Sequence, residues 1–273
     1  MRPRLVVITN GNYFARLILD RILNKYSDSI PGILLITGDY KGRTKFHALW
    51  ELGQSTATPY LVYKIFTYVV FELAQRLFPG AILTVEQQAK QKGIPVYKSI
   101  SVNSRGAYSW VASLEPGLLV SVSCPQLIRG AMLSTANLGG INIHSSLLPA
   151  YAGLAPYYWV LSAGERNTGA TVHYMTLRFD EGDILVQKQI AIEPRESAFH
   201  LFKRLALLGS EALEEAILLA LEGTEGVKQD LVKYSYYSHS SLKSYLDLRG
   251  RGHVLVRIGE LLETIRGEIR RAS

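Results

Sequence analysis

Short apolar runs alternate with segments of helical periodicity along the first half of this chain. The run Leu5–Thr9 is followed by a turn and then by a pattern that places Phe14, Leu17 and Ile18 on one helical face. Further apolar runs suited to buried strands lie at 32–37, 94–97, 118–123 and 141–144. Because strands that alternate with helices form βαβ units, the sequence predicts an α/β fold: a Rossmann-like, mostly parallel sheet with flanking helices.

The second half of the chain continues this pattern and then changes character. We expect two more strands at 171–176 and 184–190, and a long helix at 196–221 that Gly223 stops. The other expected elements are helices at 60–78, 85–92 and 258–271 and a loop with a short helix at 41–58. The sequence therefore predicts one large domain over residues 1–223 and a small C-terminal appendage over residues 224–273.

Composition excludes several classes of protein. Apolar residues make up 48% of the 273 residues and charged residues 19%, which indicates a folded globular chain. Cys124 is the single cysteine, so an internal disulfide and a cysteine-rich site are excluded, and we predict no metal centre. The lack of disulfides fits the reducing cytoplasm, and we expect the protein to be cytoplasmic. The net charge of +7 fits a partner or substrate that carries phosphate.

The most apolar later segment, residues 60–83, is not predicted to span a membrane. Lys64, Glu72 and Arg76 interrupt it and Pro79 breaks it, so the required run of about 20 apolar residues is missing. We interpret the segment as a helix that packs on the core or on a partner. A homodimer is one of the arrangements that the sequence leaves open.

Asn142 and His144 lie at the end of a predicted buried strand. Residues i and i+2 of a strand project from one face, and ligands bind at the carboxyl ends of parallel strands, so both side chains can reach one reactant. Asp180 follows in an acidic loop. A carboxamide, an imidazole and a carboxylate can stabilise an oxyanion and transfer protons during acyl transfer. Taken singly, each is more often structural: a turn asparagine, a core histidine, a hairpin aspartate.

Four blocks of the sequence resemble the folate-dependent formyltransferase family, which includes methionyl-tRNA, glycinamide ribonucleotide and amino-sugar formyltransferases. They are Asn142-x-His144, Ser146-Leu147-Leu148-Pro149-x-Tyr151-x-Gly153, Gly169-x-Thr171-x-His173 and Asp180-x-Gly182-Asp183. The similarity is close over residues 118–222 and looser over the first strand, turn and helix. It implies the formyltransferase fold and a catalytic trio of Asn142, His144 and Asp180. The aspartate of the trio follows the later histidine by seven residues, which selects Asp180 rather than Asp183.

The resemblance implies an enzyme, a transferase of one-carbon metabolism with 10-formyltetrahydrofolate as the formyl donor. An uncharged primary amine would attack the formyl carbon directly, without a covalent enzyme intermediate. Asn142 and protonated His144 would stabilise the negative charge on the carbonyl oxygen. Asp180 would orient His144 and relay a proton. Most of the acceleration would come from positioning two substrates together.

The resemblance also implies a folate pocket formed by residues 121–128 and the loop 178–183. Its predicted residues are Ser121, Ser123, Cys124, Gln126, Leu127, Ile128, His173, Arg178, Gly182 and Asp183. His173 is either a wall residue that supports Asp180 or the folate, or a core residue. The run Ser123-Cys124-Pro125-Gln126 departs from the family, in which glycine and bulky apolar residues are common here. We interpret Cys124 as a small wall residue and not a nucleophile, because no base stands beside it in sequence.

Acceptor binding is predicted at two places. Asn10, Gly11 and Asn12 follow the first strand, where acceptor groups often lie at a helix N-terminus, and Tyr151 and Gly153 follow His144. The first three residues fit a tight turn equally well. A cluster in the next loop could clamp an anionic acceptor or could be a solvated surface: Lys41, Arg43 and Lys45.

We expect a small-molecule amine as the acceptor, with a nucleotide-linked amino sugar as the leading candidate. Methionyl-tRNA formyltransferases carry a further C-terminal barrel domain. The 50 residues after Gly223 show few alternating strand patterns, so we expect that domain to be absent and tRNA to be the less favoured acceptor. Two other interpretations stay open: a non-catalytic folate-binding or nucleotide-binding protein of the same fold, and a dinucleotide oxidoreductase suggested by the first βαβ unit alone.

Overall fold

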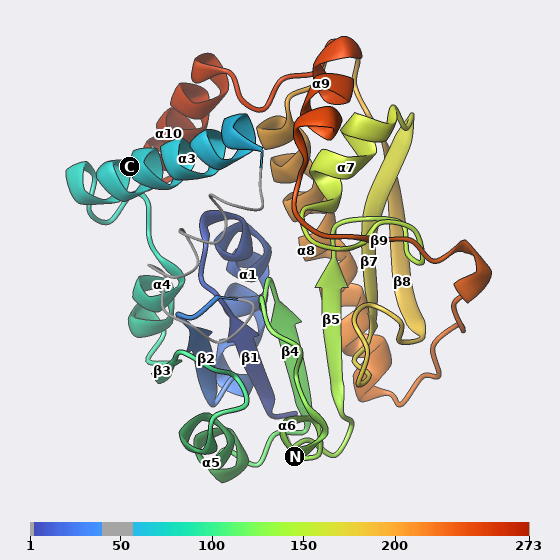
Figure 1. The fold of residues 1–273 in the computed structure, drawn as a ribbon. Coiled ribbons are helices and arrows are strands. Elements are labelled where there is room, and N and C mark those ends of the chain that lie inside the picture. Colours follow the sequence, from blue (N-terminus) through green and yellow to red (C-terminus); the bar gives the residue numbers. More distant parts are fainter. Residues whose placement is uncertain (1–2, 40–56, 273) are drawn as a thin grey trace.

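A seven-stranded sheet with helices on both faces organises the molecule (Figure 1). The computed structural model describes residues 3–39 and 57–272. The strand order is β3-β2-β1-β4-β5-β7-β8, with parallel pairs from β3 to β5 and antiparallel pairs from β5 to β8. The strands are β1 Leu5–Thr9, β2 Gly32–Ile36, β3 Val96–Ser99, β4 Leu118–Val122, β5 Gly140–His144, β7 Asn167–Tyr174 and β8 Ile184–Ala191. The predicted α/β class with a mostly parallel sheet is confirmed.

Helices cover the sheet because β1, β2 and β4 consist mainly of apolar residues that are buried on both faces. One core lies between the sheet and α1 and α8, and the other between the sheet and α5 and α6. The helices are α1 Tyr13–Tyr26, α3 Thr58–Leu77, α4 Val85–Gln91, α5 Arg105–Ser113, α6 Gly130–Leu133, α7 Pro156–Ala163, α8 Ala198–Leu221, α9 Leu242–Gly250 and α10 Ile258–Ala272. The 3-10 turns are η1 Ser27–Ser29 and η2 Leu231–Lys233.

A small second sheet brings the C-terminal part of the chain over the main sheet. Its two strands, β6 Ala152–Gly153 and β9 Tyr236–Tyr237, pair in parallel. Figure 1 shows the chain after α8 passing outside β8 and then returning to β9, which lies beyond the carboxyl end of β5. Residues far apart in sequence therefore meet at the end of the strand that carries Asn142 and His144.

Most predicted elements lie close to observed ones, and the differences have local causes. β3 starts two residues after its predicted beginning, and β7 begins at Asn167 and ends at Tyr174 rather than spanning 171–176. The helices α5, α6, α7 and α9 had no prediction. α7 is buried on nearly every side, so its sequence shows no polar face and no helical period. Most of the loop predicted at 41–58, including Lys41, Arg43 and Lys45, lies outside the described residues.

The helix predicted at 60–78 is α3, and its two sides differ. Tyr60, Tyr63 and Phe71 are buried against the rest of the protein, whereas Val62 is 59% exposed and Leu73 51% exposed. α3 therefore packs on the core along one side only. Over residues 3–39 and 57–272, no helix is long and apolar enough to cross a membrane.

The end of the described chain packs against its beginning. Arg16 of α1 forms an ion pair with Glu268 of α10 at 2.6 Å, and both side chains are more than nine-tenths buried. The Tyr13 hydroxyl donates to Glu268 Oε1 at 3.2 Å, and Leu261 of α10 is 2% exposed. Residues 224–272 thus bury side chains in contact with the larger part of the chain. The boundary at Gly223 stays a prediction.

Candidate active site at the carboxyl end of β5

Strand geometry places Asn142 beside His173. Asn142 lies on β5 directly opposite His173 of the antiparallel strand β7, and on its other side it faces Ser121 of β4. The side chains meet, with 3.2 Å between Asn142 Nδ2 and His173 Nε2. His173 Nδ1 lies 2.8 Å from the Tyr174 carbonyl, which can only accept, so this nitrogen carries hydrogen. His173 Nε2 thus lies between the Asn142 amide nitrogen at 3.2 Å and Asp180 Oδ1 at 3.6 Å.

His144 points from the same face of β5, two residues beyond Asn142. Its ring is 7% exposed, and its Nε2 donates to the Tyr151 carbonyl at 2.8 Å. Its Nδ1 lies 3.6 Å from Asp180 Oδ2. Both ring nitrogens therefore face oxygen atoms, one on the Tyr151 carbonyl and one on the Asp180 carboxylate.

Asp180 joins the two histidines. Its Oδ2 faces His144, its Oδ1 lies 3.6 Å from His173 Nε2, and the Gly153 amide donates to Oδ2 at 2.9 Å. Burial alone would raise the pKa of this carboxyl. The two imidazole rings and the Gly153 amide outweigh burial, and the pKa of Asp180 falls well below its usual value. Asp180 is therefore a carboxylate at neutral pH.

The loop around Asp180 has an unusual backbone. Asp180 has a φ of +54°, in the left-handed region that non-glycine residues seldom adopt. Gly182 lies so close to the preceding strand that a Cβ there would be 1.7 Å from the Tyr174 carbonyl oxygen. Only glycine fits this approach, and the tight turn that results directs the carboxylate of Asp180 back toward the end of β5.

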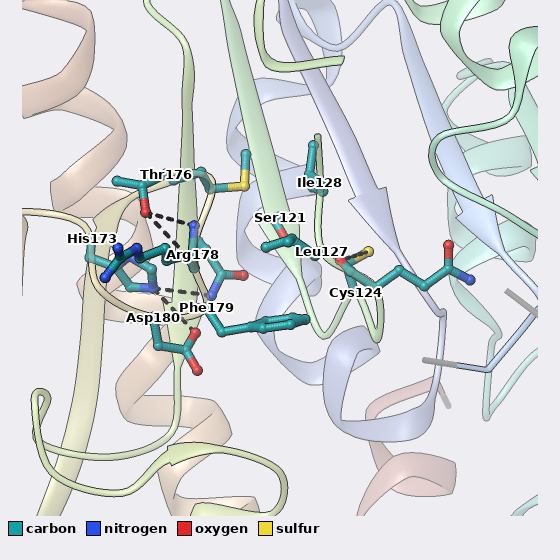
Figure 2. Close-up of a pocket in the computed structure, with 12 residues that line it drawn as sticks. Ser121, Cys124, Leu127, Ile128, His173, Thr176, Arg178, Phe179 and Asp180 are labelled. Carbon is teal, nitrogen blue, oxygen red and sulfur yellow. Dashed lines mark hydrogen bonds and ion pairs between the residues drawn. The ribbon is translucent and has the colours of Figure 1, made fainter. Parts of the chain in front are cut away.

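A cavity of about 410 Å³, partly open to solvent, adjoins this group (Figure 2). Asn142, His173 and Asp180 line it, and His144 does not. The predicted folate residues that also line it are Ser121, Cys124, Gln126, Leu127, Ile128 and Arg178. Figure 2 shows the Phe179 ring extending from the Asp180 side toward Cys124. Seven of the twelve residues that line the cavity are polar or charged, and the other five are apolar: Cys124, Leu127, Ile128, Met175 and Phe179.

The residues around Cys124 have structural bonds that shape this wall. Burial raises the pKa of the Cys124 thiol to about 12, so the thiol is protonated at neutral pH and is a poor nucleophile. The Gln126 amide donates to the carbonyls of Asp39 and Ile100, and its oxygen accepts from the Val102 amide. Gln126 therefore connects the cavity wall to two neighbouring loops.

The remaining predicted site residues do not line the cavity. Ser123 has a φ of +55° in the turn after β4, and Asp183 accepts through its carbonyl from the Tyr174 amide. Tyr151 and Gly153 reach His144 and Asp180 through their backbone, as described above. The turn after β1 is held by its own side chains: Asn10 Oδ1 accepts from the Asn12 amide, Asn12 caps α1, and Gly11 has a φ of +65°. Acceptor binding by these three residues stays a prediction.

Two lining residues had no prediction. Met175 and Thr176 follow β7 directly and line the cavity. The sequence places them inside a predicted strand that runs to residue 176, whereas β7 ends at Tyr174. Had the strand been predicted to end at Tyr174, both residues would have been candidates for the site, because the residues just after a strand belong to the loops that form such sites.

Comparison with known proteins shows which family the sequence resembles. A family model described as formyl transferase matches residues 76–217, which are 142 of the 273 residues. The methionyl-tRNA formyltransferase of Bacillus cytotoxicus is 36% identical over 153 residues, which cover 56% of this chain and 49% of that protein. The chain thus spans about half the length of the curated relatives it matches.

Solved structures share the fold at low sequence identity. Glycinamide ribonucleotide transformylase 1 from Symbiobacterium toebii has a TM-score of 0.58 at 19% identity, covering 84% of this chain and 94% of that one. The N-formyltransferase from Helicobacter canadensis, in complex with folinic acid and dTDP-3-aminofucose, has a TM-score of 0.60 at 15% identity, covering 92% and 80%. Since the family model covers more than half of the sequence, including Asn142, His144 and Asp180, the chain belongs to the formyl transferase family.

Proposed function

We propose that this protein transfers a formyl group from 10-formyltetrahydrofolate to a primary amine. The observation that supports this best is the meeting of Asn142, His173 and Asp180 in one cavity, with His144 Nδ1 3.6 Å from Asp180 Oδ2. An amide donor, imidazole rings and a carboxylate that is ionised at neutral pH are groups that can stabilise charge and transfer protons in acyl transfer to an amine. Two fold neighbours hold 5-N-formyl-THF or folinic acid, which supports a folate as the donor.

Asn142 is the donor best placed to stabilise negative charge on the formyl oxygen. It lines the cavity, and only one of its two amide hydrogens is directed to His173. An oxyanion accepts a stronger hydrogen bond than a neutral carbonyl does, so this contact favours the transition state over the bound substrate. His173 and the rigid strand β5 hold the amide in place.

His144 and Asp180 would manage the proton that leaves the attacking amine. The new bond joins the amine nitrogen to the formyl carbon, the bond from that carbon to N10 of the donor breaks, and the amine proton ends on N10. Asp180 lies at the cavity wall and can accept and pass on this proton. His144 Nε2 is bonded to the Tyr151 carbonyl, so direct contact of this nitrogen with the formyl oxygen requires that bond to be exchanged.

A nucleotide-linked amino sugar is the acceptor that we favour. The net charge of +7 suits a phosphate-bearing substrate, and the neighbour from Helicobacter canadensis holds dTDP-3-aminofucose over a fold that covers 92% of this chain. Methionyl-tRNA is the second candidate. It is favoured by the names of the curated relatives at 34–36% identity, although this chain spans only about half of their length.

The decisive experiment supplies the purified protein with 10-formyltetrahydrofolate and separate acceptors. The acceptors are nucleotide-linked amino sugars, glycinamide ribonucleotide and methionyl-tRNA, and the measurements are folate release and the mass of the product. We expect a gain of one formyl group on an amino sugar. Formylation of methionyl-tRNA alone would select the second candidate. Folate binding without transfer to any acceptor would contradict the proposed activity and favour a binding protein of the same fold.

A further inference from the structure

A segment outside the family match holds both loops of the active site. This crossing segment comprises residues 227–237, whereas the family model ends at residue 217. At its start Val227 pairs with Ile184, next to the Asp180 loop. At its end Ser235 Oγ accepts from the Tyr151 amide at 2.9 Å, and the Ser235 carbonyl accepts from Ala152 at 2.8 Å. The crossing segment thus contacts the Asp180 loop first and the Tyr151 loop second.

Gln229 makes the central contact of the crossing segment. Its side-chain nitrogen donates to the carbonyl of Asp180 at 2.9 Å and to the carbonyl of Gly182 at 2.7 Å. Both amide hydrogens are therefore used on one turn of the backbone. The Gln229 Oε1 atom is buried and has no hydrogen-bond partner in the described part of the protein. The opposite orientation of the amide would place that oxygen against two carbonyl oxygens, so the two acceptors fix which way it points.

The two carbonyls that Gln229 binds flank the strained part of the Asp180 loop. Asp180 itself has the left-handed φ of +54°, and Gly182 makes the close approach to Tyr174. A left-handed non-glycine residue persists only where its surroundings hold it. His144, His173 and Gly153 contact the Asp180 side chain, and Gln229 contacts the backbone of the same loop at the carbonyls of Asp180 and Gly182.

We infer that Gln229 is a positioning residue for Asp180. It does not touch the cavity, and its two hydrogen bonds hold the turn that directs the carboxylate toward both histidines. A displacement of reacting groups by about 1 Å can cost about 100-fold in rate, so loss of this clamp lowers kcat more than substrate binding. This consequence for catalysis rests on the proposed formyl transfer. The effect on the loop itself does not.

The test replaces Gln229 by methionine, which keeps the length of the side chain and removes both donors. Gln88→Met is the matched control. Gln88 lies on α4, is 5% exposed, donates through Nε2 to Asp20 at 2.8 Å, and also has a buried, unpartnered Oε1. Hydrogen–deuterium exchange of peptides that cover residues 175–185, thermal unfolding and steady-state kinetics are measured for each protein.

We expect Gln229→Met to raise deuterium uptake over residues 175–185 and to lower kcat by about 10- to 100-fold, with the KM for the folate donor changed less than about twofold. Gln88→Met should leave the deuterium uptake of residues 175–185 and kcat unchanged, even if it lowers the unfolding temperature. If Gln229→Met does not fold, Gln229→Asn takes its place, since it keeps the amide and shortens the side chain by one methylene. We then expect smaller increases in deuterium uptake and a smaller loss of kcat.

The two possible failures are distinguishable. Unchanged exchange and unchanged kcat in a folded Gln229 variant would overturn the positioning role while leaving formyl transfer intact. Raised exchange in the variant, together with a wild-type protein that formylates no acceptor, would overturn the proposed function and leave Gln229 as the residue that holds the loop. An equal loss of kcat in Gln88→Met would assign the effect to general destabilisation and overturn the inference.

Discussion

Asp180 shows how one side chain can be kept charged inside a protein. It is buried, which opposes ionisation, yet two imidazole rings and the Gly153 amide surround its carboxylate and lower its pKa. The same contacts fix its direction, which the left-handed backbone at this residue makes possible. The charge of Asp180, the direction of its side chain and its left-handed backbone therefore depend on one another, and a change to any of them should affect the others.

Replacing Asp180 by asparagine tests the role of the charge at nearly constant shape. The asparagine amide cannot accept a proton and carries no negative charge to face the imidazole rings of His144 and His173. We therefore expect kcat for formyl transfer to fall by at least about 100-fold. The measurement is steady-state release of folate. Asp247→Asn, a half-exposed carboxylate of α9 paired with Lys243, serves as the control and should keep full activity. Activity within a few-fold of wild type in Asp180→Asn would contradict the proton-transfer role.

The depressed pKa of Asp180 also makes a prediction about stability and pH. A carboxyl whose pKa is lower in the folded state stabilises the fold above its unfolded pKa of 3.8, and this contribution is lost as the pH falls toward the folded value. Asp180→Asn should therefore lower the free energy of unfolding at about pH 7 and have a smaller effect at about pH 3. Urea unfolding of both proteins at the two pH values measures it. A difference in unfolding free energy between the two proteins that is larger at about pH 3 than at about pH 7 would contradict the lowered pKa of Asp180.

Among the elements, the turn between β7 and β8 is the one on which the site depends most. It begins after Tyr174, carries Asp180, and returns at Ile184, so a few residues must reverse direction against the end of β5. The close contact of Gly182 with the Tyr174 carbonyl is what allows this short path. Gln229 then holds the same turn from outside.

Gly182→Ala should move this turn. The added methyl group would overlap the Tyr174 carbonyl, so we expect a loss of about 1–3 kcal/mol in unfolding free energy and at least about a tenfold loss of kcat. Urea unfolding and kinetics measure the two effects. Gly267→Ala, in α10 where no atom lies within 4 Å of the new Cβ, should instead raise stability by about 0.4–1 kcal/mol. A Gly182→Ala protein as stable and active as wild type would show that the turn can shift freely.

The parts of the fold that the sequence could predict are those with local patterns. Leu5–Thr9 is predicted at its observed bounds because every residue is apolar and a turn follows. The shared face of Asn142 and His144 follows from the two-residue period of a strand, and the resemblance to a known family selects Asp180. Gln229 and the carbonyl of Tyr151 had no such signal, because their roles arise from backbone contacts between segments distant in sequence.

At the scale of the whole molecule, α1 and α10 join the two ends of the described chain. The Arg16–Glu268 pair is buried, Tyr13 donates to the same carboxylate, and burial together with Glu268 raises the pKa of the Tyr13 hydroxyl. A buried pair of this kind adds little net stability compared with apolar residues, but removing one partner leaves the other charge without compensation. The C-terminal helix is therefore tied to the first helix by charge as well as by packing.

Glu268→Gln should lower the free energy of unfolding by about 3–5 kcal/mol, since Arg16 would keep a buried charge without a counter-ion. Urea unfolding at neutral pH measures the loss. The double replacement Arg16→Met with Glu268→Leu removes both charges and should recover most of the stability. A single variant as stable as wild type, or a double variant less stable than the single one, would contradict the pairing.

The contact between α1 and α10 has a consequence for how the protein is made. Arg16 is synthesised 252 residues before its counter-ion Glu268, so the first helix waits for its partner while all of that chain is made. During that time the apolar surface that α10 covers is open to solvent and to other chains. Nascent chains that pause before residue 268 should therefore be sensitive to proteases and dependent on chaperones, and they should reach a resistant state only once α10 has been synthesised and has packed on α1.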